Sequence, residues 1–154
     1  MTKLAAFSHR FFLVYISMQI CIATSYNVVD FGAIPDGKTD STSAFLKAWT
    51  AACNSDDEPT MLIPSGTFLV NSISFNGPCK NQMKLQISGT IVAPNSYKCF
   101  LSHQAWIKFH GVPRLLVVGG TIDAKGSNYW SCKTGGKTNC PYGAKSFTLQ
   151  SCDD

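Results

Sequence analysis

The sequence has 154 residues, of which 45% are apolar and 14% are charged. This length suits one domain with a buried core, and the composition excludes a disordered chain, which needs low hydrophobicity and high net charge. The formal net charge is only +4. Because the Lys and Arg residues are scattered singly, we expect no nucleic-acid partner.

The first 25 residues have the layout of a secretory signal peptide. Lys3 and Arg10 precede an uncharged apolar run at 11–23, and small residues stand just before Tyr26. A membrane anchor is the alternative, but a spanning helix needs about 20 apolar residues, which this run does not reach. We therefore expect 1–25 to be removed, and the mature chain to be secreted and free of the membrane.

Six cysteines follow this leader, and an even number in a secreted chain indicates disulfides. They are Cys53, Cys79, Cys99, Cys132, Cys140 and Cys152. Six cysteines allow 15 connectivities, and the sequence alone does not choose among them; the preferred pairs are Cys53–Cys79 and Cys132–Cys140. Their spacing matches no zinc motif, so we expect neither a metal nor a cofactor.

The mature chain begins with a predicted short strand at 26–32 and a turn at 35–37. Residues 39–41 supply helix N-cap chemistry, and an apolar stripe then predicts a helix over roughly 41–53. The stripe consists of Ala44, Phe45, Ala48, Trp49 and Ala52. No other segment of the mature chain predicts a helix convincingly.

The rest of the chain is predicted to form strands, and their sequence pattern repeats. The segments 62–68, 85–91 and 117–122 each contain an apolar strand, then Gly-Thr, then an apolar residue. A period of 20 to 50 residues is typical of stacked repeats, and glycine lets the backbone bend between two strands of one coil. This pattern predicts a parallel β-helix. Further strands are expected at 68–70, 72–75, 91–93, 106–109 and 115–118, and one more begins near 147.

The predicted helix precedes the first repeat, and this order suggests its role. A coil cannot bury its own inward face, so each coil needs a neighbour, and the first coil lacks one on its N-terminal side. We expect Phe45 and Trp49 to cover that open end. An ordinary helix packed on a sheet is the alternative. The predicted fold is therefore all-β, with three to four coils and a short N-terminal capping helix.

Several segments, taken together, closely resemble the N-terminal part of plant polygalacturonases, which are glycoside hydrolases of family 28. The matching pieces lie at 26–33 with 36–40, 48–53, 62–68, 77–80, 89–94 and 106–130. The resemblance implies a right-handed parallel β-helix that hydrolyses α-1,4 links between galacturonic acid units, with inversion. It also implies pectin or polygalacturonate as the partner and the plant cell wall as the location. We expect a monomer.

The resemblance further implies that catalysis uses an Asn-Thr-Asp motif, an Asp-Asp pair and a Gly-His-Gly motif, with Arg-Ile-Lys binding substrate. None of these can be placed here. His110 comes before the Gly-Gly-Thr segment, the wrong side for the catalytic histidine, so a strand-end or corner position is expected. Asp153-Asp154 follows no Asn-Thr-Asp, Asp123 reads as a corner residue, and Glu58 lies in a polar loop. No catalytic or substrate-binding residue is assigned.

Three hypotheses follow from the sequence. In the first, the chain is the N-terminal, truncated part of a pectin hydrolase and is inactive alone. In the second it is a non-catalytic cell-wall or pectin-binding fragment, and in the third a truncated product without function. A different β-helix glycosidase, such as a rhamnogalacturonan hydrolase, stays open. Cleavage, binding without cleavage, or aggregation of the purified chain would distinguish the three.

Overall fold

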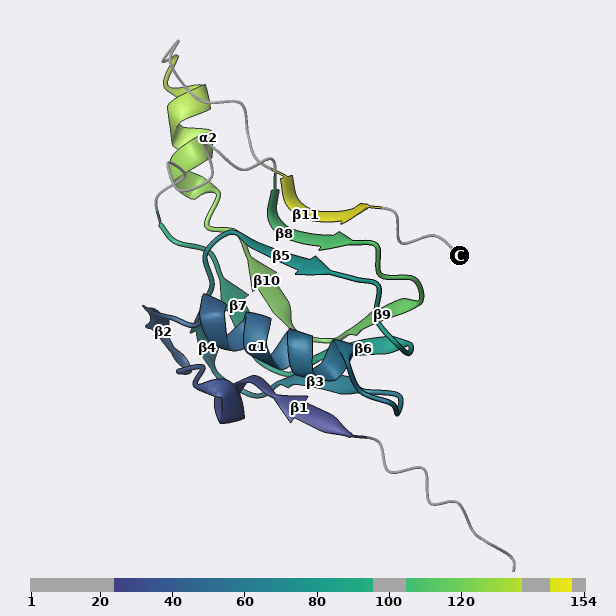
Figure 1. Cartoon of the computed structure of the whole chain (residues 1–154). Helices are drawn as coiled ribbons and strands as arrows, with labels where there is room; N and C mark the ends of the chain where they lie inside the picture. Colours follow the sequence, from purple (N-terminus) through teal and green to yellow (C-terminus); the bar gives the residue numbers. More distant parts are fainter. Residues whose placement is uncertain (1–23, 96–104, 137–144, 151–154) are drawn as a thin grey trace, which may run out of the picture.

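The computed structural model describes residues 24–95, 105–136 and 145–150. Its strands form three parallel sheets (Figure 1). The first sheet contains β1 Ser25–Asn27, β3 Thr60–Ile63, β6 Met83–Ile87 and β9 Leu115–Val118. The second contains β2 Asp36–Asp40, β4 Thr67–Leu69, β7 Thr90–Val92 and β10 Thr121–Asp123. The third contains β5 Ile73–Asn76, β8 Ala105–His110 and β11 Lys145–Gln150.

The chain visits the three sheets in turn, so the predicted parallel β-helix is confirmed. Coil 1 consists of β1 and β2, and α1 (Thr42–Cys53) follows them. Coil 2 is β3, β4 and β5, coil 3 is β6, β7 and β8, and coil 4 is β9, β10 and β11. Each strand pairs in parallel with the equivalent strand of the next coil.

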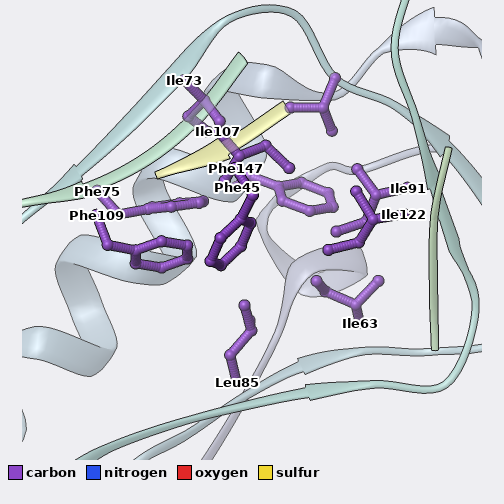
Figure 2. Close-up of a pocket in the computed structure, with 11 residues that line it drawn as sticks. Phe45, Ile63, Ile73, Phe75, Leu85, Ile91, Ile107, Phe109, Ile122 and Phe147 are labelled. Carbon is purple, nitrogen blue, oxygen red and sulfur yellow. The ribbon is translucent and has the colours of Figure 1, made fainter. Parts of the chain in front are cut away.

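This pairing stacks inward-facing apolar residues into rows along the β-helix. Phe68 lies beside Ile91, which in turn lies beside Ile122. Similar rows run through the other two sheets. In a parallel sheet the neighbouring strands lie about 4.8 Å apart, so side chains in one row touch. The rows surround a space lined only by apolar side chains (Figure 2).

The expected bends at the Gly-Thr repeats lie at the corners between the first and second sheets. Gly66, Gly89 and Gly120 all stand just before the second-sheet strand of their coils. Gly120 has a φ of +69°, a backbone conformation that favours glycine. At Gly89, an added Cβ would lie 2.4 Å from the Pro64 carbonyl oxygen in coil 2. A larger residue at either corner would therefore push the coils apart or strain the backbone.

Helix α1 covers the N-terminal end of the β-helix, as the sequence predicts. In Figure 1 it lies across the space between the three sheets. Phe45 and Trp49 are both buried, and Trp49 Nε1 donates a hydrogen bond to the Asn76 carbonyl at 3.1 Å. The Trp49 ring centroid lies 4.8 Å from that of Phe75. The helix thus closes the first coils with aromatic side chains.

An aromatic ladder continues from this cap through the interior of three coils. Phe75 stacks on Phe109 with ring centroids 4.9 Å apart, and Phe109 lies 5.3 Å from Phe147. Coils 2, 3 and 4 each contribute one of these rings. The ladder therefore links α1 at one end of the structure to β11 at the other.

The structure corrects three local predictions at the N-terminal end. The strand predicted at 26–32 ends at Asn27, because the Asn27 side chain accepts from Val29 N and starts a 3-10 helix, η1 (Val28–Phe31). The predicted turn at 35–37 opens the strand β2, which pairs with β4. Within the expected cap, Ser41 is the N-cap residue but makes no capping bond; Asp40 instead accepts from Thr42 N.

The expectation of a single helix was also wrong. A second helix, α2 (Ser127–Thr134), lies between β10 and β11. It has no apolar stripe, and Trp130 on it is 64% exposed. Its hydroxyl side chains bond back to carbonyls four residues earlier, from Ser131 to Ser127 and from Thr134 to Trp130. None of the described side chains of α2 is buried, and a helix without an apolar stripe leaves no periodic pattern in the sequence.

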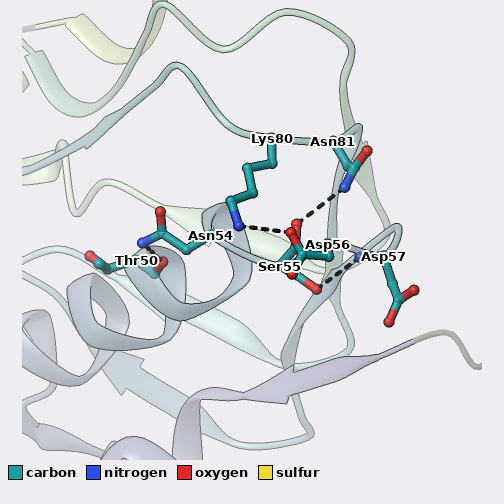
Figure 3. A network of polar contacts seen from close by, with 7 residues as sticks. All are labelled: Thr50, Asn54, Ser55, Asp56, Asp57, Lys80 and Asn81. Atoms are coloured by element: carbon teal, nitrogen blue, oxygen red, sulfur yellow. Dashed lines mark hydrogen bonds and ion pairs between the residues drawn. The ribbon is translucent and has the colours of Figure 1, made fainter.

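A disulfide joins Cys53, the last residue of α1, to Cys79 in the β5–β6 loop, with 4.5 Å between their Cα atoms. This is the first of the two pairs preferred from the sequence. Polar contacts also join the residues that follow the two cysteines (Figure 3): Lys80 Nζ lies 2.7 Å from Asp56 Oδ1, and Asn81 donates to the Ser55 carbonyl. The end of the capping helix is thus fastened to coil 2.

The second preferred pair is not settled. Cys132 on α2 is disulfide-bonded, whereas Cys140 lies outside the described residues. The Cys132–Cys140 pairing therefore stays a prediction.

Truncation of the aromatic ladder should destabilise the whole β-helix. Phe109 is fully buried between Phe75 and Phe147, so Phe109→Ala should lower the free energy of unfolding by about 3–5 kcal/mol. The exposed ring of Trp130 offers a matched control, and Trp130→Ala should cost about 0.5 kcal/mol or less. Urea unfolding of both variants measures this. Equal costs would contradict the ladder's role.

Candidate functional site: the polar outer face of the third sheet

The outer face of the third sheet carries polar side chains in every described coil that reaches it. Residues alternate along each strand, so Ile73 and Phe75 on β5 point inward and are buried, whereas Ser74 and Asn76 are exposed. The same alternation on β8 and β11 completes the face. Its members are Ser74, Asn76, Lys108, His110, Ser146, Thr148 and Gln150. We call this set the polar face.

Two rows across the coils organise the polar face. Ser74, Lys108 and Thr148 lie in register in one row. Asn76, His110 and Gln150 form the next row, at the ends of the three strands.

Backbone hydrogen bonds continue just past the second row. Gly77 N donates to the His110 carbonyl at 2.8 Å, and Gly111 N donates to the Gln150 carbonyl at 3.0 Å. The polar side chains are thus held on a regular backbone rather than on loops, which favours precise positioning.

The outer faces of the other two sheets are less polar. On the first sheet, the row that contains Asn27 continues through Leu62 and Gln86 to Val118. On the second, Leu69 lies beside Val92. Aliphatic residues therefore interrupt both faces, whereas the exposed and half-buried outward positions of the third sheet are all polar. Trp106, which lies on the same side of β8 as Lys108, is buried. This contrast makes the polar face the best candidate for binding a polar polymer.

The chemistry of the polar face suits a carbohydrate that carries negative charge. Hydroxyl and amide side chains both donate and accept hydrogen bonds, and Lys108 adds a cation with three donors. Lys108 is half-buried at the centre of its row. Among the described outward residues of this face, none is a carboxylate. The face can therefore bind sugar hydroxyls and a sugar acid, but its described residues contain no carboxyl group to protonate a glycosidic oxygen.

Four carboxyl groups elsewhere in the described chain have lowered pKa values. Hydrogen bonds from Thr39 and Lys38 lower the pKa of Asp36 to about 2. A hydrogen bond and the charge of Lys80 lower the pKa of Asp56, and Lys125 does the same for Asp123.

The pKa of Asp40 is also lowered, although two opposing effects act on it. Burial raises the pKa of Asp40, but hydrogen bonds from Thr42 and Asn71 outweigh this and leave the pKa lowered. The general acid of a glycosidase needs a raised pKa. The pKa values of these four carboxyl groups are therefore shifted downward, whereas a general acid would need an upward shift.

The residues considered from the sequence fall in separate places. His110 ends β8 on the exposed side, as a strand-end residue, and belongs to the polar face. Asp123 ends β10 and accepts from Lys125 N at 2.9 Å, which confirms the corner role. Glu58 is exposed in the loop between α1 and β3. Asp153 and Asp154 lie outside the described residues.

Within the ranges that the structure describes, no cluster of His, Cys, Asp or Glu could hold a metal ion.

The sequence reasoning overlooked the polar face itself. The alternation within 72–76 and 106–110 marks Ser74, Asn76, Lys108 and His110 as outward positions, and this signal was available. It did not show that the two segments lie in register on one sheet. That information comes only from the pairing of the coils.

Comparison with known proteins identifies the family. The model of glycosyl hydrolases family 28 matches residues 53–154, which is most of the chain. The chain belongs to this family.

The family 28 relatives include plant enzymes. The chain is 42% identical over 134 residues to a polygalacturonase of Prunus persica, covering 86% of this chain and 34% of that protein. It is 38% identical over 108 residues to an exopolygalacturonase of Zea mays, covering 70% of this chain and 26% of that protein. The chain thus spans between about a quarter and a third of the length of these relatives.

A solved structure shares the fold. A hyperthermoactive exopolygalacturonase from Thermotoga maritima superimposes with a TM-score of 0.62 at 22% identity, covering 76% of this chain and 30% of the other. At this identity the likeness concerns the fold.

The lowered pKa of Asp36 predicts that the start of strand β2 is sensitive to acid. Because its pKa falls from 3.8 to about 2 on folding, the ionised carboxylate stabilises the folded chain above about pH 4. This stabilisation is lost as the pH falls toward about 2. Urea unfolding across this window should show a shallower loss of stability for Asp36→Asn than for the unmodified chain. Parallel curves would contradict the prediction.

Proposed function

We propose that this chain forms the N-terminal coils of a family 28 hydrolase that acts on galacturonate-containing pectin, and that the polar face contacts the polysaccharide. The observation that carries the proposal is the family match, together with 42% identity to a polygalacturonase. The polar face supports it independently, because an extended polymer can lie across stacked coils that present hydrogen-bonding side chains at a regular spacing.

Lys108 favours an acidic sugar over a neutral one. It stands between Ser74 and Thr148 in the middle of the polar face, where its ammonium group can pair with a sugar carboxylate. His110 and Asn76, one row away, can bind hydroxyl groups of the same polymer. This combination fits a galacturonate chain, in which each unit has both hydroxyls and a carboxyl group.

We also propose that these 154 residues bind pectin without cleaving it. Inverting hydrolysis needs one carboxyl group as acid and carboxylate help to activate water. The motifs that the family resemblance implies for these roles cannot be placed in the sequence. The lowered pKa values of Asp36, Asp40, Asp56 and Asp123 agree with structural roles for these groups. A non-catalytic pectin-binding role is therefore the second candidate function for this chain.

The proposed place of action is the extracellular plant cell wall. The layout of residues 1–25 supports export by a signal peptide, and the Cys53–Cys79 disulfide suits an oxidising compartment. In the part of the chain that the structure describes, no helix is long and apolar enough to span a membrane.

Replacement of Lys108 tests the binding role of the polar face. Lys108→Gln should weaken binding to polygalacturonate about two- to fivefold, the effect expected for one solvent-accessible ion pair. The difference should shrink as salt screens the charges. Isothermal titration calorimetry or affinity electrophoresis measures the change.

Lys84 provides the matched control, because it is a half-buried outward lysine on β6 in the first sheet. Lys84→Gln removes the same charge from another face and should leave the affinity within experimental error. A fully methyl-esterified pectin should show no effect of either substitution. Equal losses in the two variants would contradict the polar face as the binding surface, since net charge alone would then explain them.

A further inference from the structure

The end of β5 lies at one edge of the third sheet, where helix α1 takes the place of a further strand. Among the described strands, β5 pairs only with β8, so backbone hydrogen bonds reach it from one side. From the other side, Trp49 Nε1 donates a hydrogen bond to the Asn76 carbonyl at 3.1 Å. Asn76 is the last residue of β5 and belongs to the polar face. A buried residue of the cap thus contacts the backbone of a residue of the candidate binding surface.

Trp49 is the side chain that satisfies this partly buried carbonyl. Cys53 Sγ also lies 3.9 Å from the same oxygen, but its disulfide with Cys79 leaves this sulfur without a hydrogen to donate. A buried carbonyl left without a donor costs free energy. The indole N–H of Trp49 therefore stabilises the position of the Asn76 backbone.

The Trp49 indole is itself held in one position. Trp49 is buried, and its ring centroid lies 4.8 Å from that of Phe75 and 5.5 Å from that of Phe109. The Cys53–Cys79 disulfide fastens the end of the same helix to coil 2. A close-packed interior leaves a large side chain little freedom to move, so the N–H stays directed at its acceptor.

The Asn76 side chain is held together with its backbone. Gly77 N donates to the His110 carbonyl at 2.8 Å, which ties the chain just past Asn76 to coil 3. Asn76 Oδ1 accepts from Ser74 Oγ at 3.2 Å. Because the amide oxygen faces this hydroxyl, the amide nitrogen, which can donate two hydrogen bonds, points away from it. Trp49, coil 3 and Ser74 together set the direction of this donor.

We propose that Trp49 is a positioning residue of the polar face, which fixes the Asn76 amide for the polysaccharide without touching the polymer. This role rests on the proposed binding function, because a fixed donor matters only where a ligand is bound. A side chain that is ordered before binding loses less conformational freedom when the ligand arrives. The capping helix and the binding surface are then coupled through one hydrogen bond.

Replacement of the indole by a phenyl ring tests this role. Trp49→Phe keeps a ring against Phe75 and removes the N–H, and should weaken binding of polygalacturonate about two- to fivefold. Isothermal titration calorimetry, performed well below the unfolding midpoint of each variant, measures the change. Trp106→Phe is the matched control, because Trp106 Nε1 donates in the same way to the Val70 carbonyl at 2.9 Å, before β5 begins. The control should bind as the unmodified chain does.

A double-mutant cycle separates positioning from a general loss of structure. Asn76→Ala should itself weaken binding, because it removes the amide. In that background Trp49→Phe should cause no further loss, since the group that Trp49 positions is absent. A general loss of structure would instead add its effect to that of Asn76→Ala.

NMR of the unmodified chain tests the same coupling without any variant. On addition of an oligogalacturonate, the Nε1–H resonance of Trp49 should shift although the ring is buried, whereas that of Trp106 should not. An unshifted Trp49 resonance, unchanged affinity of Trp49→Phe, or additive effects in the cycle would each overturn the positioning role and leave the binding function in place. Absence of binding by the unmodified chain would overturn the proposed function, and the role of Trp49 with it.

Discussion

Burial of one coil against the next is the interaction on which the rest of this structure depends. The strands are only three to six residues long, too short to form stable elements alone. Their inward side chains are buried only because a neighbouring coil supplies the matching residue of the same row. Helix α1 and the Cys53–Cys79 disulfide extend this burial to the N-terminal end, where no preceding coil is described.

The polar face is a consequence of the same constraint. Since successive strand residues point to opposite faces, fixing Phe75 and Phe109 inward also fixes Asn76 and His110 outward, side by side. A shift of one residue in this register would bury the polar side chains and break the aromatic ladder. The apolar interior therefore provides the precision that the proposed polysaccharide-binding surface needs, although the two surfaces share no atoms.

Local patterns predict most of the coils, and long-range pairing explains the rest. The Gly-Thr repeats and alternating apolar residues mark the strands, because corners and half-buried strands have strong local requirements. The helix α2 escapes prediction because it buries no apolar stripe, and η1 because an Asn27 side chain redirects the backbone. The role of Lys108 cannot be read locally either, since Ser74 and Thr148 reach it only through pairing between coils of unequal length.

The central proposal is that the stacked coils present a surface that binds an acidic polysaccharide, and that the described residues carry no acid–base pair to cleave it. Incubation of the purified chain with polygalacturonate, followed by assay of both bound polymer and new reducing ends, tests both halves together. We expect saturable binding and no reducing ends above those of a mock preparation. Release of reducing ends that scales with the amount of chain would contradict the claim, and so would the absence of binding.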